Sequence, residues 1–198
     1  VSLVSLMDHS PGQRQFVNPQ KYREYFQGKY HLSDEQMDTY EREQLENAER
    51  WSQPNRHAIA ELCRSRGIAL ASHDDATEAH ADESHKLGSV IAEFPTTAEA
   101  AHASHQRGLQ VMMGAPNIVR GGSHSGNVAA HELASLGVLD ILSSDYYPAS
   151  LLDAAFSVAA CDSNAFTLPQ AISLVTRNPA KALGLSDRGI LAEGKRAD

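Results

Sequence analysis

Residues 69–77 read ALASHDDAT, and this short stretch decides the fold class that we expect. The apolar run at 68–71 is typical of a buried strand, and it ends abruptly in His73, Asp74 and Asp75 before a helical pattern begins. Side chains at the carboxyl ends of strands meet the ligand in α/β enzymes, so the stretch has the layout of an active-site edge. The alternative is that Asp74 or Asp75 only caps the helix and that His73 is an ordinary turn residue.

A strand, a polar tip and a helix recur along the chain at intervals of roughly 20–30 residues. The predicted strands cover residues 1–7, 68–72, 89–92, 109–113 and 138–142. The predicted helices beside them cover residues 77–87, 98–107, 128–136, 151–161 and 169–182. Strands joined by helices run parallel through right-handed crossovers, so all the polar tips should lie at one edge of the sheet. Both a three-layer open sheet and an arc of a (β/α) barrel fit this α/β pattern.

The segment 18–66 departs from this rhythm because it is long, polar and helical. Residues 34–51 are dense in Glu, Gln and Arg, with opposite charges four residues apart, which indicates a solvated helix. Pro54 is expected to break this helix or to start the next one, which should end with Gly67 as its C-cap. We assign no chemistry to this segment.

Composition excludes several classes of function. The chain has 17 basic and 25 acidic residues and a formal net charge of −8, with no basic stripe, which argues against a nucleic-acid partner. No apolar run is long enough to cross a membrane. Cys63 and Cys161 have neither a metal-binding nor a redox spacing, so we expect a reduced, cytoplasmic setting. Because Val1 opens inside a predicted strand, and residues 189–198 lead toward a strand that does not follow, we expect a piece of a longer protein.

Histidines and carboxylates gather at the predicted tips, which hold Asp8, His9, His73, Asp74, Asp75, Glu93 and Asp145. These side chains are the ligands of hard or borderline divalent metals. A metal there could lower the pKa of water, and Asp145 could take the proton as general base. The plainer alternative is that Asp8, Asp74 and Asp75 only cap helices and that Glu93 only supports a turn. The spacing alone matches no zinc signature.

Two arginine-containing loops are candidates for binding phosphate. Residues 120–127 read RGGSHSGN, where adjacent glycines let backbone N–H groups approach an anion and Arg120 and Ser123 add donors. The loop lacks the Gly-Lys-Ser/Thr ending of a Walker A motif, and it could instead be a lid or a plain turn. Arg14 follows Pro11 and Gly12 in the first loop, where its guanidinium could hold a phosphate or a carboxylate.

Several motifs together resemble one family. They are LMDHSPGQRQ at 6–15, ASHDD at 71–75, EFPTT at 93–97, the loop at 117–127, SSDY at 143–146 and NPAKALGL at 178–185. They are similar to the amidohydrolase-superfamily enzymes of phosphonate breakdown in the carbon–phosphorus lyase pathway. The resemblance implies the C-terminal portion of a (β/α)8, TIM-like metal-dependent hydrolase barrel whose N-terminal strands are missing. Residues 1–186 would be the partial barrel, and residues 187–198 the start of a return to a small β domain.

The resemblance also implies an activity and a set of residue roles. The reaction is hydrolysis of α-D-ribose 1-methylphosphonate 5-triphosphate to the 5-phosphate and pyrophosphate, with a divalent metal that is zinc, manganese or magnesium. His73 would be the fifth-strand ligand and Asp145 the eighth-strand aspartate that activates water. Glu93 stands where the superfamily usually has a histidine, and the fourth-strand tip carries His9 but no lysine. With the first half of the barrel missing, we expect weak or no turnover from the chain alone.

The resulting hypothesis assigns the metal to His73, His9 and Glu93 and the base to Asp145. The charge of a phosphorylated small-molecule substrate would be neutralised by Arg14, Arg120, Ser123 and His124. One alternative is an amidohydrolase that cleaves a C–N bond in an amide or cyclic amidine, which the Arg/Gly loop disfavours. Another is a non-catalytic half-barrel that forms a homodimer through its exposed sheet edges.

Overall fold

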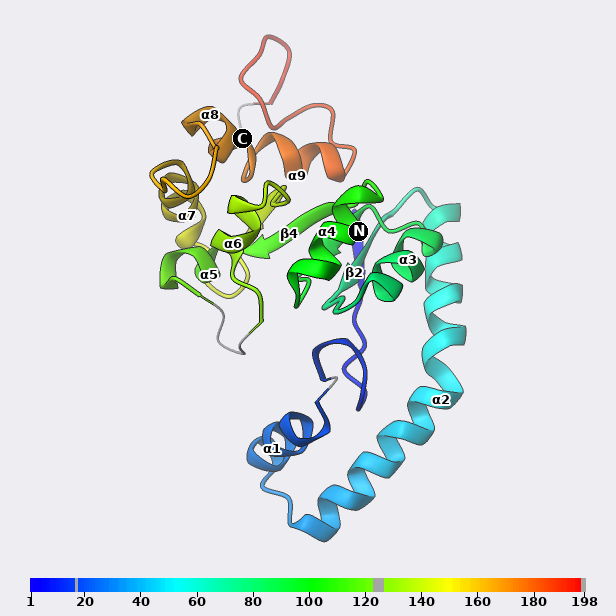
Figure 1. Ribbon diagram of the computed structural model, residues 1–198. Helices are drawn as coiled ribbons and strands as arrows, with labels where there is room; N and C mark the ends of the chain where they lie inside the picture. Colours follow the sequence, from blue (N-terminus) through cyan, green and yellow to red (C-terminus); the bar gives the residue numbers. More distant parts are fainter. Residues whose placement is uncertain (17, 123–126, 197–198) are drawn as a thin grey trace.

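Five short strands form one parallel sheet in which each strand lies beside the next in the sequence (Figure 1). The strands are β1 (Leu3–Leu6), β2 (Ala69–His73), β3 (Ile91–Glu93), β4 (Gln110–Gly114) and β5 (Ile141–Ser143). The structure is a computed structural model and describes residues 1–16, 18–122 and 127–196. The parallel order confirms the predicted α/β fold and is consistent with part of a (β/α)8 barrel. All five strands therefore end at one side, which we call the carboxyl edge.

Helices connect and surround these strands in the described part of the chain. They are α1 (Pro19–Tyr30), α2 (Asp34–Ser65), α3 (Glu78–Leu87), α4 (Ala98–Gln106), α5 (Ala115–Arg120), α6 (Ala130–Ser135), α7 (Ser150–Ala159), α8 (Leu168–Ser173) and α9 (Arg177–Ala182), with a 3-10 turn η1 (Arg14–Phe16). Two differences from the sequence predictions matter for the site. α5 occupies residues that were expected to be a loop, and the single helix expected at 169–182 is divided into α8 and α9.

The helices that leave β2 and β3 begin and end where the sequence predicts. The side chain of Thr77 accepts a hydrogen bond from the backbone N–H of His80, and the side chain of Thr97 accepts one from Ala100. Gly88 ends α3 in the left-handed conformation at φ +90°, which a glycine adopts without steric cost. Local capping therefore sets where the chain turns away from each strand tip.

The prediction that Pro54 interrupts the long helix is wrong. α2 continues for 32 residues with Pro54 inside it, although it changes direction along its length (Figure 1). Proline removes one backbone donor and crowds the preceding turn, which costs about 3 kcal/mol in a helix interior. The packing of Ala60 and Cys63 against Leu6 and Leu70 holds the second half of α2 on the sheet and offsets this cost.

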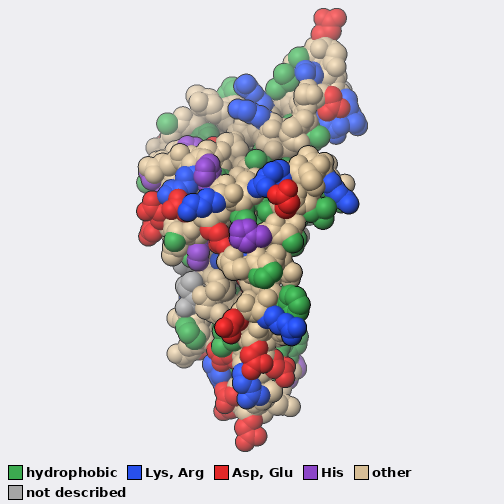
Figure 2. All heavy atoms as spheres, turned by 90° about the vertical axis from the view of Figure 1, so that its right-hand side faces the viewer, with side chains coloured by type: hydrophobic (Ala, Val, Ile, Leu, Met, Phe, Trp, Pro, Cys, Tyr) green, Lys and Arg blue, Asp and Glu red, His purple; other side chains and the backbone are tan. Residues whose placement is uncertain are grey.

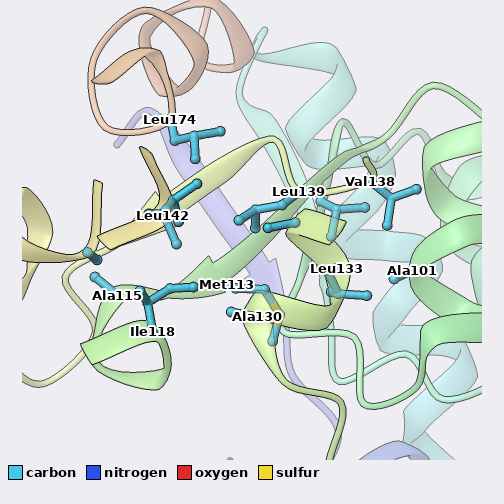
Figure 3. Packing of buried hydrophobic residues seen from close by; sticks show 14 of the residues in the cluster. Ala101, Met113, Ala115, Ile118, Ala130, Leu133, Val138, Leu139, Leu142 and Leu174 are labelled. Carbon is cyan, nitrogen blue, oxygen red and sulfur yellow. The ribbon is translucent and has the colours of Figure 1, made fainter. Parts of the chain in front are cut away.

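The largest apolar core lies around β4 and β5 (Figure 3). Met113 and Leu142 from these strands pack with Leu133 of α6, Val158 of α7 and Leu174 beyond α8. Burying each of the larger side chains contributes about 1.5–3 kcal/mol relative to leaving it in water. This core fixes the ends of β4 and β5, and with them the residues that follow at the carboxyl edge.

A second cluster of apolar side chains holds together a helical arm, which we define as residues 19–51 of α1 and the first part of α2. Phe16, Tyr22, Phe26 and Met37 are all buried in it. The arm projects from the body of the molecule on the side to which β1 leads (Figure 1). Its core is separate from that of the sheet, so Phe16 is the point where the loop after β1 joins the arm.

The outer surface of the arm is charged, as its sequence predicts. Figure 2 shows acidic and basic side chains intermixed along it. Arg23 of α1 pairs with Asp38 and Glu41 of α2 at 2.6 Å each. Although α2 is long, no helix in the described ranges is apolar enough over a sufficient length to span a membrane.

The last described residues, 187–196, form turns and contain no strand. The backbone N–H of Arg196 donates to the carbonyl of Asp187 at 2.7 Å, which closes this segment on itself. The expected domain boundary near residue 186 stays a prediction.

Candidate active site

His9, His73 and Asp74 bring three metal-ligand atoms together at the carboxyl edge. His73 ends β2, Asp74 follows it, and His9 lies three residues beyond the end of β1. Oδ2 of Asp74 lies 2.8 Å from Nδ1 of His73 and 3.3 Å from Nε2 of His9. One donor atom from each residue lies within 4.8 Å of the other two, and His73 and Asp74 are buried.

The spacing of these donor atoms is close to that of ligands around one cation. Among the described residues, Nδ1 of His73 is buried and has no hydrogen-bond partner, although the carboxylate oxygen lies within hydrogen-bonding distance. Two ligands at about 2.1 Å from one divalent metal lie about 3.0–3.4 Å apart at octahedral or tetrahedral angles. The 3.3 Å between His9 and Asp74 falls in this range, and the 2.8 Å between His73 and Asp74 is slightly shorter. The donor set of two imidazoles and a carboxylate therefore fits a borderline divalent metal such as zinc.

Burial and charge act in opposite directions on these groups. Burial alone would lower the pKa of His73, but the adjacent carboxylate of Asp74, with Glu93 behind it, raises that pKa above its usual value. Burial alone would raise the pKa of Asp74, but the neighbouring His73 and His9 hold that pKa below its usual range. The carboxyl group of Asp74 is therefore ionised at neutral pH.

Glu93 lies beside this group without being one of the three converging ligands. The sheet register pairs it with His73, and its backbone carbonyl accepts a hydrogen bond of 2.9 Å from the N–H of Asp74. Its side chain accepts a hydrogen bond from the hydroxyl of Ser5 in β1. Metal binding by Glu93 stays a prediction, and Asp74, which the sequence also offered as a helix cap, is the carboxylate that the structure places between the two histidines.

Asp145 and Arg120 line the same side of the molecule as Asp74. A cavity of about 190 Å³ at the carboxyl edge is bordered by Asp74, Asn117, Arg120, Asp145 and Tyr146. The expectation that the tips of β2 and β5 and the loop after β4 share one edge is therefore confirmed in geometry. The catalytic role of Asp145 and the phosphate-binding role of Arg120 stay predictions.

The loop after β4 differs from the phosphate cradle that its glycines suggested. The backbone N–H groups of Gly121 and Gly122 donate to the carbonyls of Ile118 and Asn117 and so close the end of α5. These two amides are therefore already satisfied, which leaves Arg120 as the described donor of the predicted cradle. Nη1 of Arg120 donates a 2.7 Å hydrogen bond to the hydroxyl of Tyr146.

Two residues of the predicted phosphate site, Ser123 and His124, lie outside the described residues. Their assignment stays a prediction from the sequence.

Arg14 is not the accessible cation that the sequence predicts. Its side chain is 2% exposed and forms an ion pair with Asp75, which is 1% exposed. Nη2 of Arg14 also lies 2.9 Å from a carboxylate oxygen of Glu83 in α3. Burial, with the nearby charge of Arg56, lowers the pKa of Arg14 to about 10, which still leaves it charged at neutral pH. The protein's own carboxylates occupy this guanidinium, so we assign it no phosphate.

Several non-glycine residues at the carboxyl edge have a strained, left-handed backbone conformation, which the sequence did not predict. Asp74, Phe94 and Asp145, which follow β2, β3 and β5, have φ values of +57°, +53° and +48°, and Arg14 in the loop after β1 has +43°. A non-glycine residue in this region costs about 1–3 kcal/mol, and such residues cluster at functional sites. The sequence signal that favours Asp74 over Glu93 as a candidate ligand is its position directly after a strand-ending histidine.

Comparisons with known proteins identify the family of this chain. A model of the amidohydrolase family matches residues 18–198. The chain is 76% identical over all of its 198 residues to a protein of Escherichia coli (strain K12) named alpha-D-ribose 1-methylphosphonate 5-triphosphate diphosphatase. It covers 52% of that protein, so it spans about half the length of the curated relative. The resemblance expected from the sequence motifs is confirmed, and the chain belongs to the amidohydrolase family.

Proposed function

We propose that this chain contributes the carboxyl edge of a metal-dependent hydrolase that cleaves α-D-ribose 1-methylphosphonate 5-triphosphate to the 5-phosphate and pyrophosphate. The observation that carries the proposal is the placement of His9, His73 and Asp74 on the same edge as Asp145 and Arg120. We infer the substrate from the name of the 76% identical diphosphatase. Because the chain covers about half of that relative, we assign turnover to this edge within a whole barrel.

His9, His73 and Asp74 would hold the metal, with Glu93 as a further donor from β3. A divalent cation bound there supplies a Lewis acid and lowers the pKa of water. Two imidazoles favour zinc, with manganese as the next choice and magnesium, which prefers oxygen ligands, as the last. The buried positions of His73 and Asp74 keep both donors oriented without a large loss of side-chain entropy.

In this proposal Asp145 would receive the proton of the attacking water. Its carboxylate borders the cavity that Asp74 also lines, so a water molecule there has a proton acceptor on the β5 side. As the water oxygen forms its bond to phosphorus, the bond between the first and second phosphoryl groups breaks and pyrophosphate leaves. The proton passes from water to a carboxylate oxygen of Asp145.

Arg120 would neutralise the charge that the triphosphate brings to this cavity. A guanidinium binds phosphate oxygens in a fixed fork, and the hydrogen bond to Tyr146 holds one arm of that fork in place. We include Ser123 and His124 in this part of the proposal on the basis of their positions in the sequence after Arg120.

The remaining parts of the proposal concern the setting of the enzyme. The partner is a phosphorylated small molecule, and a cytoplasmic location is supported by two unpaired cysteines, Cys63 and Cys161. The outer edge of β1 pairs with no strand in the described part, so a homodimer of the isolated chain is the non-catalytic alternative. The molar mass of the purified chain, measured by size-exclusion chromatography with light scattering, distinguishes a monomer from a dimer.

The test uses a hybrid protein in which this chain replaces the matching half of the E. coli relative. We expect the hybrid, loaded with zinc or manganese, to release pyrophosphate from α-D-ribose 1-methylphosphonate 5-triphosphate. Asp145→Asn should lower kcat by about 10²–10⁴-fold, as loss of a general base does. The matched control, Asp162→Asn, changes an exposed aspartate in the turn after α7 and should leave kcat unchanged.

A panel of small amides and cyclic amidines tests the C–N alternative on the same hybrid. Release of pyrophosphate without amide cleavage supports the proposal. A folded, metal-loaded hybrid that cleaves an amide but not the triphosphate, or that is as active with Asp145→Asn, contradicts it.

A further inference from the structure

We propose that Arg14 is a positioning residue, whose buried ion pairs fix the loop that carries His9 against the tip of β2. The inference rests on the proposed metal centre and adds to it a residue that contacts neither metal nor substrate. Of the three converging ligands, His73 lies in a strand and Asp74 directly follows it, whereas His9 lies in a loop. Something must therefore hold His9 at 3.3 Å from Asp74.

The side chain of His9 itself has few contacts that could hold it there. His9 is an exposed residue whose ring contacts are edge-on, to His73 at 5.7 Å and to Phe16 at 5.8 Å between centroids. Within the loop, the N–H of Gly12 donates to the carbonyl of Phe16 and the N–H of Gln13 to that of Ser10. These bonds shape the turn, but they do not connect it to β2.

Arg14 makes that connection. One arm of its guanidinium pairs with Asp75, the residue after the ligand Asp74, and the other reaches Glu83 in α3. Asp75 is itself fixed, because its second carboxylate oxygen accepts a 2.9 Å hydrogen bond from Ser84. The planar fork of arginine holds two carboxylates in one geometry, which joins the loop after β1 to the loop after β2.

The energetics favour a role in orientation over one in stability alone. A buried ion pair is often no more stabilising than apolar side chains of the same volume, because both charges lose their hydration. Arg14 also holds a left-handed backbone conformation at φ +43°, which costs free energy of its own. What the arrangement achieves is a defined distance between two loops that each carry a metal ligand.

Cobalt(II) binding to the 198-residue chain, followed by its visible spectrum, tests the proposal independently of catalysis. Arg14→Met should weaken Co²⁺ affinity about 10–100-fold, the usual effect of losing a group that orients a ligand. Arg14→Lys, which keeps the charge but loses the fork, should recover part of the affinity. The matched control, Arg107→Met, also removes an arginine paired with two carboxylates, Glu78 and Asp82, and should not change Co²⁺ binding.

A double-mutant cycle separates positioning from general loss of structure. If Arg14 acts through His9, then Arg14→Met should cause no further loss of Co²⁺ affinity in a His9→Ala background. Equal losses in both backgrounds, or no loss in either, would overturn the proposal. Should Arg14→Met not fold, the same cycle is run with Arg14→Gln combined with Asp75→Asn, which leaves no unpaired buried charge.

The outcomes also distinguish this inference from the proposed function. If the hybrid releases pyrophosphate but Arg14 and His9 show no coupling in Co²⁺ affinity, only the positioning role of Arg14 is refuted. Coupling in Co²⁺ binding without pyrophosphate release removes only the proposed reaction. If the unaltered chain binds no Co²⁺, both the metal centre and the role of Arg14 are refuted.

Discussion

The carboxylate of Asp145 lies over Gly114, so that a Cβ atom placed on Gly114 would be 3.2 Å from Oδ2 of Asp145. The backbone of Gly114 has φ −71° and ψ 128°, values that any residue adopts. Glycine therefore gives the Asp145 carboxylate space here and is not needed for conformational freedom. Gly114, at the end of β4, therefore leaves space for the side chain of Asp145, which follows β5. This space helps to determine the position of the proposed general base.

Gly114→Ala should disturb catalysis much more than stability. The added methyl group pushes the Asp145 carboxylate by a few tenths of an ångström. A displacement of about 1 Å can cost about 100-fold in rate, so this smaller shift should cost up to about 10-fold. We expect kcat of the hybrid protein to fall by that factor while its metal content stays the same. Gly28→Ala in α1, where a Cβ would meet nothing within 4 Å, is the control and should leave kcat unchanged. Full activity of Gly114→Ala would show that Asp145 does not act from this position.

His73→Ala should abolish tight metal binding because it removes a buried ligand. We expect zinc affinity, measured by titration calorimetry, to fall by more than the roughly 100-fold that follows loss of a supporting group. His102→Ala removes an exposed histidine of α4 and should leave the affinity unchanged. Equal affinities of the two variants would place the metal elsewhere.

Arg120→Met should raise KM for the triphosphate substrate. A hydrogen bond to a charged group contributes about 1.5–3 kcal/mol, which corresponds to about 10–100-fold in KM if Arg120 binds substrate and transition state alike. Tyr146→Phe, which removes the hydroxyl that holds Arg120, should show a smaller rise in KM. Arg66→Met, an exposed arginine at the end of α2, serves as the control in the same steady-state assay. A change confined to kcat would instead place Arg120 at the reacting bond.

Glu83→Gln should reduce the dependence of the free energy of unfolding on pH. Burial would raise the pKa of Glu83, but hydrogen bonding from Gln53 and the charges of Arg56 and Arg14 hold it below the usual value. A lowered pKa means that the stabilisation is fully present above the unfolded value of about 4.3 and is lost as pH falls through the folded value.

We expect the Gln variant to be less stable by about 1–3 kcal/mol at pH 7, with the difference shrinking as the solution is acidified. Urea unfolding curves of both proteins from pH 7 downward measure this difference. If the difference in free energy of unfolding between the two proteins grows as the pH falls, the pKa of Glu83 is not lowered by folding, and the prediction is contradicted.

The sequence predicted the ends of helices well where neighbouring residues alone determine them. Helices were predicted at 77–87 and 98–107, and α3 and α4 lie there to within one residue at each end. The cap of α3 is Thr77 and not Asp74 or Asp75, which the sequence also offered. Pro54 was misread because its unfavourable local effect is offset by packing between α2 and the sheet, which a linear pattern does not contain.

The site was only partly predictable for a related reason. His73 and His9 could be assigned as neighbours because parallel strands end at one edge. The burial of Arg14 could not, since its partner Glu83 is 69 residues away and its charge alone suggested an external anion. The choice of Asp74 over Glu93 as the converging carboxylate depends on a left-handed backbone turn that no residue type there demands.

Anomalous diffraction from crystals of the hybrid protein grown with zinc tests the central claim most directly. The account predicts a strong zinc peak about 2.0–2.2 Å from Nε2 of His9, Nδ1 of His73 and Oδ2 of Asp74. A zinc-loaded crystal whose peaks all lie away from these three atoms would contradict it.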